Sequence, residues 1–459
     1  MFSEKIICIF AWICLVGLGL PMVSMAETQG KHYTFDLSSC TQQVLKANPR
    51  AKVAKLDVEE ADLQFQSAKL SRIPKIELFN RTGIVNDAEG DAVTGEDHEG
   101  SFGPFNKLDL QLTQPLYTFG RIKHNIEAAN INVDRQKASR SKTASKLILD
   151  AHKRYYGFVL AQQLLKTTRD IQKNFSDAHE IAEERLDQGD ALVTETDALK
   201  LRVGLAVVTK NLYKVQREAR MTKEALREIM GLEDRVDFDT TEKRLKLVEF
   251  SLQPLDHYLA EAGENNPNVR QLQAVVKAEE ARYLAERAKF YPTILALGGL
   301  RHAVAPGREE QENPFLTDNF NFFDAGVALG LKWDLSFIQT NTEVKRQKVR
   351  YLRAKSRLDR VLNGVRLQVK DKYHRYKEKE NNLEASFDAK KAGRALLFLN
   401  LTNFRLGMGS GKDVFDSLSL HARTDGDYYQ AIFEFNMAVV ELNDAIGRLS
   451  PDTYTNTDS

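Results

Sequence analysis

Apolar and polar positions follow a helical period over two long parts of this chain. Over residues 121–186 and about 193–230, apolar side chains recur every three or four positions between charged ones. Among them are Leu147, Ile148, Ala151, Tyr155, Phe158 and Leu165. None of the eleven prolines falls within 116–253 or 315–450, and Ala, Leu, Lys, Glu, Arg and Gln dominate both stretches. Because proline interrupts helices, both stretches are predicted to be long amphipathic helices.

A period of two replaces the helical period in shorter segments. Residues 107–113 place Leu108, Leu110 and Leu112 on one face and polar side chains on the other, and residues 324–333 alternate in the same way. Such alternation over about ten residues is typical of a transmembrane barrel strand, but a soluble half-buried strand alternates identically. Tyr117 and Trp333 near the strand ends favour the membrane reading slightly, and residues 76–85 are predicted to form a further strand.

The chain contains an internal duplication with a period near 218 residues. Asn48-Pro49 and Asn266-Pro267 open two similar segments, and a second proline follows each at the same distance. "RLDQGDALVTETDAL" from residue 185 resembles "RLGMGSGKDVFDSLS" from residue 405. Such a period is too long for a solenoid unit and indicates two copies of one half-protein. The predicted divisions are 1–26, 27–231, a linker at 232–254, 255–449 and a tail at 450–459. The linker segments "RVDFDT" and "KLVEF" suit a short strand region.

Each half is predicted to run in one order: short helix, two strands, long helix, glycine turn, second helix. The first long helix would span roughly 100 Å and its hairpin partner only roughly 57 Å. We therefore expect the short helix and the second helix to stack end to end beside the long one. Helices with so few apolar residues must pack as coiled coils. The predicted fold class is mainly α with a small β part.

The N-terminus and the charge balance bound the location and partners of the protein. Residues 1–26 have the lysine, apolar run and small-residue motif of a secretory signal peptide. Cleavage after it would expose Glu27 and leave Cys40 as the sole cysteine, so neither a disulfide nor a lipid-anchored N-terminus is predicted. The 459 residues carry a formal charge of +1, which predicts no nucleic-acid partner. Four strands cannot close a barrel, whereas three chains would supply twelve.

No catalytic or cofactor motif is present in the sequence. The glycine-rich stretch 405–416 has Leu406 and Asp413 where a phosphate-binding loop needs Gly and Ser or Thr. His179-Glu180 lacks the second histidine of a zinc motif, and Cys40 is interpreted as a small apolar residue. We therefore predict that the protein is not an enzyme and uses no cofactor or metal.

Taken together, the chain resembles the TolC-like outer-membrane efflux protein family. The resemblance rests on the two Asn-Pro helix starts, "QPLYTFGR" at 114–121, the paired "RLxxG" turns at 185 and 405, and "DVFD" at 413–416, and it covers nearly the whole mature chain. It implies a homotrimeric, twelve-stranded outer-membrane β-barrel in a Gram-negative bacterium, continued by a long periplasmic α-helical coiled-coil tunnel. It also implies docking with a periplasmic membrane-fusion adaptor and an inner-membrane transporter, for export of small molecules or, as in type I secretion, proteins.

The resemblance also implies roles for particular residues. The glycine turns would be hairpin tips recognised by the adaptor, with glycine supplying a left-handed conformation. The tip residues are Arg185, Leu186, Gly189, Arg405, Leu406 and Gly409. Asp413 and Asp416 would form an acidic ring at the closed end of the tunnel, although acids also simply favour a helix N-terminus. In the first half Val193 and Thr196 align with them, so the pair is absent there.

Two departures from the family pattern affect these expectations. Phe404 stands where an aromatic residue with a hydroxyl is expected, and Gly409 where an arginine is expected, so the hydrogen-bonded gate latch of well-known relatives is not expected here. Pro115 and Gly120 mark a strand-to-helix bend, and the second half has Asp334 and Gln339 instead. That second bend is expected to differ.

Two other classes of protein remain as alternatives. A soluble periplasmic coiled-coil adaptor or scaffold would share the helices, but its usual single hairpin with compact β domains fits poorly with a duplicated hairpin and two isolated strand pairs. An outer-membrane enzyme would need a catalytic cluster that the sequence does not show.

Overall fold

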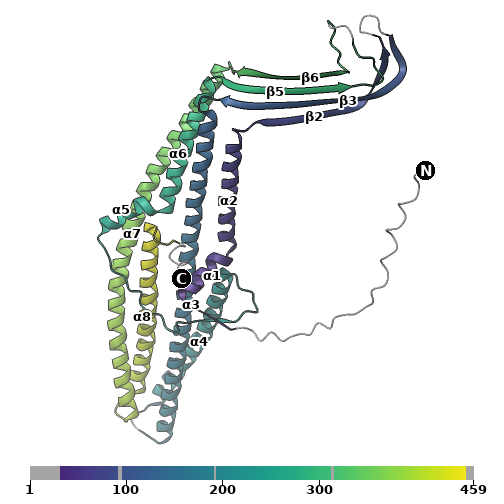
Figure 1. The fold of residues 1–459 in the computed structure, drawn as a ribbon. Helices are drawn as coiled ribbons and strands as arrows, with labels where there is room; N and C mark the ends of the chain where they lie inside the picture. The colour runs from purple at the N-terminus through teal and green to yellow at the C-terminus, as the bar shows by residue number, and fades with distance from the viewer. Residues whose placement is uncertain (1–31, 91–95, 191–192, 312–314, 451–459) are drawn as a thin grey trace, which may run out of the picture.

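The computed structural model describes residues 32–90, 96–190, 193–311 and 315–450. The predicted signal peptide (1–26) and the predicted tail beyond its first residue, Ser450, lie outside the described residues. A four-stranded sheet stands at one end of an elongated helical body, and long helices run away from it (Figure 1).

The sheet consists of two hairpins, one from each repeat. β2 (Lys75–Glu89) pairs with β3 (Glu96–Tyr117), β3 pairs with β5 (Thr293–Val304), and β5 pairs with β6 (Phe322–Lys332). All three pairings are antiparallel. β2 extends beyond the predicted 76–85. Within the described chain, β2 and β6 each keep one edge without a partner strand, so the sheet is open.

The strand register sorts apolar and polar side chains onto opposite faces. Leu110 lies opposite Leu78 on one side and Leu300 on the other, and directly opposed residues share a face. Val327 and Leu329 on this apolar face are 92% and 79% exposed. The large aliphatic side chains on this face include Ile76, Leu78, Leu108, Leu110, Leu112, Leu300, Val327, Leu329 and Leu331, and the polar Asn80, Gln114 and His302 lie among them. The predicted alternation is therefore real, and its apolar side lies on the surface of the single chain.

The opposite face of the sheet is polar. Arg81 Nη2 lies 3.2 Å from Asp109 Oδ2 across the first hairpin, and Arg301 pairs with Asp324 across the second. The alternation thus gives one charged face and one apolar face, which is the arrangement a strand needs between water and lipid.

Two long helices form the axis of the helical body. α3 (Arg121–Asp187) has 67 residues and α7 (Phe337–Arg405) has 69, so each is about 100 Å long. α2 (Pro49–Leu70) and α4 (Glu195–Met230) lie one after the other along α3, and α6 (Pro267–Arg287) and α8 (Gly411–Ile446) do so along α7 (Figure 1). The predicted end-to-end stacking is confirmed. Near the sheet the helices are ordered α2-α3-α6-α7, and further away α4-α3-α8-α7.

Two helices were missing from the sequence prediction. α1 (Leu37–Ala47) and α5 (Leu255–Asn265) precede the Asn-Pro motifs. Asn48 ends α1 and caps α2 by accepting from the Arg50 amide at 3.0 Å, and Asn266 does the same between α5 and α6. Asn-Pro is therefore a corner between two helices, because its asparagine is extended and its proline suits the first helical position.

The linker contains less strand than its sequence suggested. β4 (Phe238–Thr240) pairs in parallel with β1 (Tyr33–Phe35), which confirms strand in "RVDFDT". The second expected segment, "KLVEF" at 246–250, is not a strand. Its Val248 amide instead donates to Asn436 Oδ1 at 3.0 Å, so α8 supplies the partner that a strand would have supplied.

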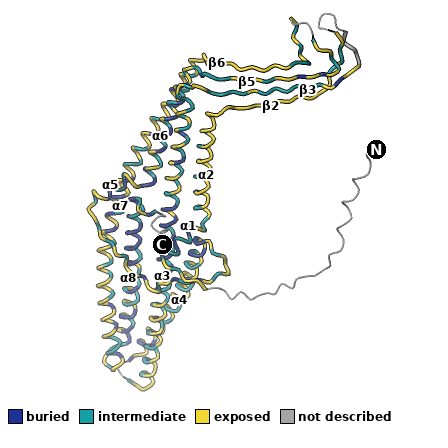
Figure 2. Tube along the Cα trace, viewed as in Figure 1, coloured by how far each residue is buried: buried dark blue, intermediate teal, exposed yellow. Residues whose placement is uncertain are grey.

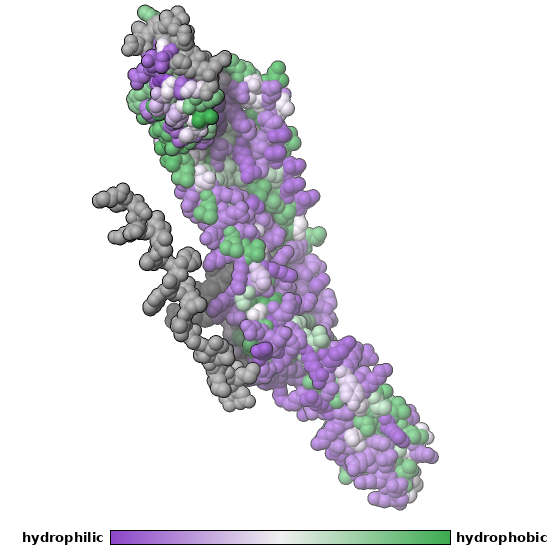
Figure 3. All heavy atoms as spheres, turned by 90° about the vertical axis from the view of Figure 1, so that its right-hand side faces the viewer, coloured by the Kyte–Doolittle hydropathy of each residue, from purple (hydrophilic) through white to green (hydrophobic). Residues whose placement is uncertain are grey.

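The buried residues lie along the helix seams (Figure 2). Where α1, α3, α4 and the linker meet, Tyr155, Phe238 and Met230 are fully buried together with Cys40. Burial raises the pKa of the Cys40 thiol to about 12, so the sulfur is a packing atom and not a nucleophile. Among the described residues, no helix is long and apolar enough to cross a membrane. The visible helical surface is mostly hydrophilic with scattered hydrophobic spots (Figure 3).

Candidate functional site at the hairpin tips

The two hairpins end side by side at the pole opposite the sheet. The first turn joins α3 to α4 and uses Gly189 at φ +75°, which confirms the predicted left-handed glycine. In the second turn, between α7 and α8, the left-handed residue is Gly407 at φ +79°, and the expectation for Gly409 was wrong. Gly409 has a different requirement, because a Cβ there would lie 3.1 Å from the Phe404 backbone nitrogen.

Arg185 joins the two tips. Its guanidinium donates from Nη1 to the Phe404 carbonyl oxygen at 2.8 Å and from Nε to Asp190 Oδ2 at 2.9 Å. It also lies 5.4 Å from the centroid of the Phe404 ring. The Arg185 side chain is only 14% exposed, and Phe404 is fully buried. Arg185 therefore bridges the end of α3 to the end of α7. Its side chain is largely enclosed between the two turns, whereas a docking residue would be exposed.

The exposed part of the tips comes mainly from the second turn. Leu406 and Met408 are 65% and 70% exposed, and Arg405 and Gly189 are exposed as well. Leu186 is half-buried. The repeat-related arginines Arg185 and Arg405 thus differ sharply in environment: one is enclosed between the turns and the other extends into solvent.

Asp413 and Asp416 lie in the first turns of α8 with exposed side chains. Ser410, the N-cap of α8, accepts from the Asp413 amide at 3.2 Å and donates from its hydroxyl to Asp413 Oδ2 at 2.8 Å. Asp413 therefore contributes to helix capping, while Asp416 has no such partner among the described contacts. Lys412 is exposed, as expected for a residue at the tip.

The sequence alignment of the two turns was wrong by four residues. Thr194 caps α4 as Ser410 caps α8, so Asp197, and not Val193, is the equivalent of Asp413. Asp197 is 7% exposed and accepts from the Lys412 amide of the other hairpin at 3.1 Å. The first half therefore does hold one acid of the pair, turned inward as a second bridge between the hairpins.

The strand-to-helix bend follows the sequence in the first half. Gly120, the N-cap of α3, has φ +92°, and the pairing register of β3 shifts next to Pro115. In the second half, Asp334 Oδ1 accepts from the Ser336 amide at 2.9 Å, and Trp333 donates to the Phe290 carbonyl at 3.1 Å. The expected difference between the two bends is thus present. The bend of the first half uses a glycine in a left-handed conformation, and the bend of the second half has side-chain hydrogen bonds instead.

A buried polar cluster above the tips was not found from the sequence. Asp425 of α8 is 7% exposed, lies 2.9 Å from Lys390 Nζ of α7 and accepts from the Thr167 hydroxyl of α3 at 3.1 Å. Asp425 stands seven residues from both Leu418 and Ile432, which places it at a core position of the heptad pattern. An acid at such a position was the sequence signal that could have revealed the cluster. Next to it, burial lowers the pKa of His421.

No grouping of His, Cys, Asp or Glu suited to a metal occurs among the described residues. His179, the histidine of the rejected zinc motif, lies 3.4 Å from Glu183 of its own helix. The site is therefore a set of bridges between helices, with an apolar exposed turn beside two exposed carboxylates.

Residues 40–232 match the family model described as "Outer membrane efflux protein". The matched part, 193 of the 459 residues, resembles this family, as expected from the sequence. The family model and two of the relatives given below, SilC and OprN, are all described as outer-membrane proteins. A curated relative, "Probable outer membrane lipoprotein SilC" from Salmonella typhimurium, is 23% identical over 280 residues, which make up 60% of this chain. The matched part spans 58% of SilC, less than two thirds of its length.

Solved structures of channel proteins share the fold of about nine tenths of this chain. The outer-membrane channel OprN superposes with a TM-score of 0.72 at 17% identity, covering 90% of this chain and 89% of OprN. CusC gives 0.73 at 16%, covering 92% and 95%, and the CmeC outer membrane channel of Campylobacter jejuni gives 0.71 at 14%, covering 90% and 86%. The fold expected from the sequence, mainly helical with four strands per chain, is therefore confirmed.

Proposed function

We propose that three copies of this chain form an exit duct through the outer membrane. The duct would export small molecules or secreted proteins together with a periplasmic adaptor and an inner-membrane transporter. The observation that carries this proposal is the sheet, because one face is largely apolar and lies on the surface of the chain while both edges are open. Lipid would cover such a face, but lipid does not tolerate unpaired strand edges.

Copies of the sheet can close on one another without changing the pairing pattern. Since each neighbouring pair is antiparallel, β6 runs opposite to β2, and β6 of one copy can therefore pair antiparallel with β2 of the next. Four strands are too few for a closed sheet, and three copies give twelve. The faces would keep their alternation, so the ion pairs Arg81–Asp109 and Arg301–Asp324 would face the interior.

The outermost helices have the surfaces that neighbouring copies would need. α2 exposes Val53, Leu56, Leu63 and Leu70, each by more than half, and the exposed face of α7 includes Val349 and Leu367. Exposed apolar stripes of this kind on amphipathic helices are typical of coiled-coil partners. They lie at the two ends of the helix order α2-α3-α6-α7, where the next copy would join.

The tips would form the periplasmic end of the duct. We propose that Leu406, Met408 and Arg405, with Gly189 and Leu186, dock the adaptor, since these side chains lie at the pole furthest from the sheet. Asp413 and Asp416 of three copies would form rings of carboxylates at that end, which attract cations.

Disulfide trapping tests the closed sheet. We would combine Leu78→Cys on β2 with Ala325→Cys, Val327→Cys or Leu329→Cys on β6, all on the apolar face. Oxidation in isolated outer membranes should give covalent trimers on a denaturing gel for at least one pair. Gly326→Cys and Ala328→Cys face the other side and serve as matched controls. Native Cys40 does not compete, because it is fully buried. Recovery of the protein in the soluble periplasm, without trimers, would refute the duct and favour the scaffold.

Conductance in planar bilayers tests the acidic ring. Purified trimers should conduct ions, and Asp413→Asn combined with Asp416→Asn should lower the preference for cations. Asp187→Asn, an exposed acid at the end of α3, is the matched control at the same pole. An unchanged cation preference in the double variant would remove the ring from the proposal.

A further inference from the structure

A basic zone crosses the helical wall just beyond the sheet. Residues 346–357 of α7 contain six lysines and arginines and no acid. Residues 267–280 of α6 contain Arg270 and Lys277 with Glu279 and Glu280, and residues 127–141 of α3 contain three basic residues and two acids. We call these three segments the basic belt. Its excess of seven positive charges contrasts with a total of +1 for the whole chain.

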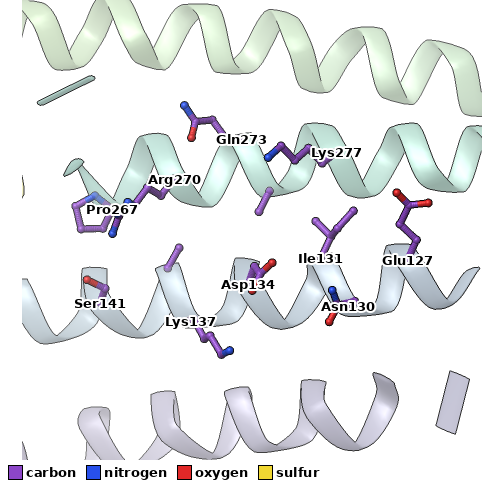
Figure 4. A pocket seen from close by; sticks show the side chains of 12 residues that line it. Glu127, Asn130, Ile131, Asp134, Lys137, Ser141, Pro267, Arg270, Gln273 and Lys277 are labelled. Atoms are coloured by element: carbon purple, nitrogen blue, oxygen red, sulfur yellow. The ribbon is translucent and has the colours of Figure 1, made fainter. Parts of the chain in front are cut away.

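The three segments of the belt lie at one level. Gln347 of α7 donates to Glu279 of α6 at 2.6 Å. A groove of about 680 Å³ lies between α3 and α6, and its lining runs from Glu127 to Ser141 on one helix and from Pro267 to Lys277 on the other. Figure 4 shows this groove between the two helices, with α7 beyond α6 and α2 beyond α3. The charges therefore form one zone of the wall and not a run along a single helix.

Few of these charges are neutralised within the chain. All six basic side chains of residues 346–357 are exposed. Of these six, only Arg346 has an ion-pair partner in the described part of the chain, Glu343 of its own helix. α2, the next helix in the wall, carries four basic and four acidic residues and does not offset the excess.

The helical periodicity of α7 determines which way these charges can point. Val344, Gln347 and Ala354 are buried on the side of α6. At 100° per residue, the exposed Val349 and Leu367 lie on the opposite side, where the proposed neighbouring copy would pack. Two sides remain, one facing the interior of a tube and the other its exterior.

Both remaining sides of α7 are basic. One carries Arg346, Arg350, Arg353 and Arg357, which we call the arginine side. The other carries Lys348, Lys355 and Arg366, which we call the lysine side, with Asp359 as its acid. Whichever of the two faces inward, the interior wall at this level is positive. Threefold symmetry multiplies that charge by three within a low-dielectric wall, which raises the local concentration of counter-ions.

We infer that the basic belt makes the duct favour anionic solutes in the segment beside the membrane. This inference rests on the proposed function, because the belt needs a tube to enclose it. Its chemistry opposes that of Asp413 and Asp416 at the far end, so the duct would have a carboxylate entrance and a cationic upper section. The preferred cargo would then be small molecules that carry a net negative charge, such as carboxylates or phosphates.

Reversal potentials in planar bilayers test the inference with two matched variants. The first replaces the four residues of the arginine side by glutamine, and the second replaces Lys348, Lys355 and Arg366 by glutamine. Both sets of substitutions are made in the otherwise unchanged chain and in the Asp413→Asn, Asp416→Asn double variant. The double variant removes the tip carboxylates, so that they do not determine the permeability ratio of chloride to potassium. A salt concentration of 0.01 M, with a Debye length of about 30 Å, lets wall charges act across the interior.

We expect one variant to lower the permeability ratio of chloride to potassium by about threefold to tenfold while the other leaves it unchanged. The unaffected variant identifies the exterior side and controls for folding, as does the presence of trimers for both. Channels that conduct with an unchanged ratio in both variants would overturn the inference and leave the duct intact. Trimers that conduct no ions in any form would instead count against the proposed function itself.

Discussion

Replacing Arg185 by alanine should loosen the contact between the two hairpin tips. The change removes the hydrogen bond from Nη1 to the Phe404 carbonyl at 2.8 Å and the ion pair with Asp190. A hydrogen bond to a charged group contributes about 1.5–3 kcal/mol, and a cation over an aromatic ring about 0.5–1 kcal/mol. Because Asp190 is 30% exposed and can be rehydrated, we take the lower ends of these ranges. The expected loss is about 2–3 kcal/mol, or a factor of about 30–150 in a local opening equilibrium.

Hydrogen exchange measured by mass spectrometry on peptides covering residues 400–412 is the direct assay. Exchange there should accelerate by about that factor in Arg185→Ala, while peptides from the middle of α3 stay unchanged. Arg185→Lys should give an intermediate effect, since it keeps the charge but loses the two-pronged geometry. The repeat-related Arg405→Ala is the matched control, because Arg405 is exposed. Equal acceleration in Arg405→Ala, or none in Arg185→Ala, would refute the bridge.

Three further changes test the packing, the bend and the response to acid. Leu201→Ala, at a fully buried site near the tips, should cost about 2–5 kcal/mol of unfolding free energy in a denaturant titration, while Leu199→Ala, 52% exposed, should cost far less. Gly120→Val should destabilise the strand-to-helix bend by at least about 1–2 kcal/mol, seen as a lower thermal midpoint, because φ is +92° there. Burial lowers the pKa of His152 below its usual 6.5, so the folded state binds its proton later than the unfolded chain. The thermal midpoint should therefore fall as the pH drops below about 6.5, and His152→Gln should flatten that fall; an equal slope in both proteins would contradict this assignment.

Periodicity predicted the elements because each depends on residues close together in the chain. The alternation at 107–113 gave the faces of β3, and the predicted helix at 121–186 matches α3. The proline-free stretch 315–450 contained α7 but did not give its ends. The Asn-Pro motifs were read as helix starts but not as corners, since α1 is only 11 residues long and lacks a strong sequence signal. The strand pair β1-β4 was missed in part because its members are about 205 residues apart.

The candidate site shows the same division between local and distant information. The sequence identified the tip segments and placed Asp413 and Asp416 at the start of a helix, because turns and caps are local. It aligned Asp413 with Val193, and only the positions of the two N-caps showed that Asp197 is the equivalent residue. It also assigned Arg185 to an exposed docking surface, whereas the folded chain encloses its side chain against Phe404.

The sequence by itself determined the duplicated order of elements, the two faces of the sheet and the length of the first long helix. Each of these follows from spacing within one element or from comparison of the two halves. The tertiary structure decided which residues hold the hairpins together, namely Arg185 with Phe404, Asp197 with Lys412, and Thr167 with Asp425. All three pairs join residues more than 200 positions apart. No local pattern specifies such partners, because they meet only when the helices pack.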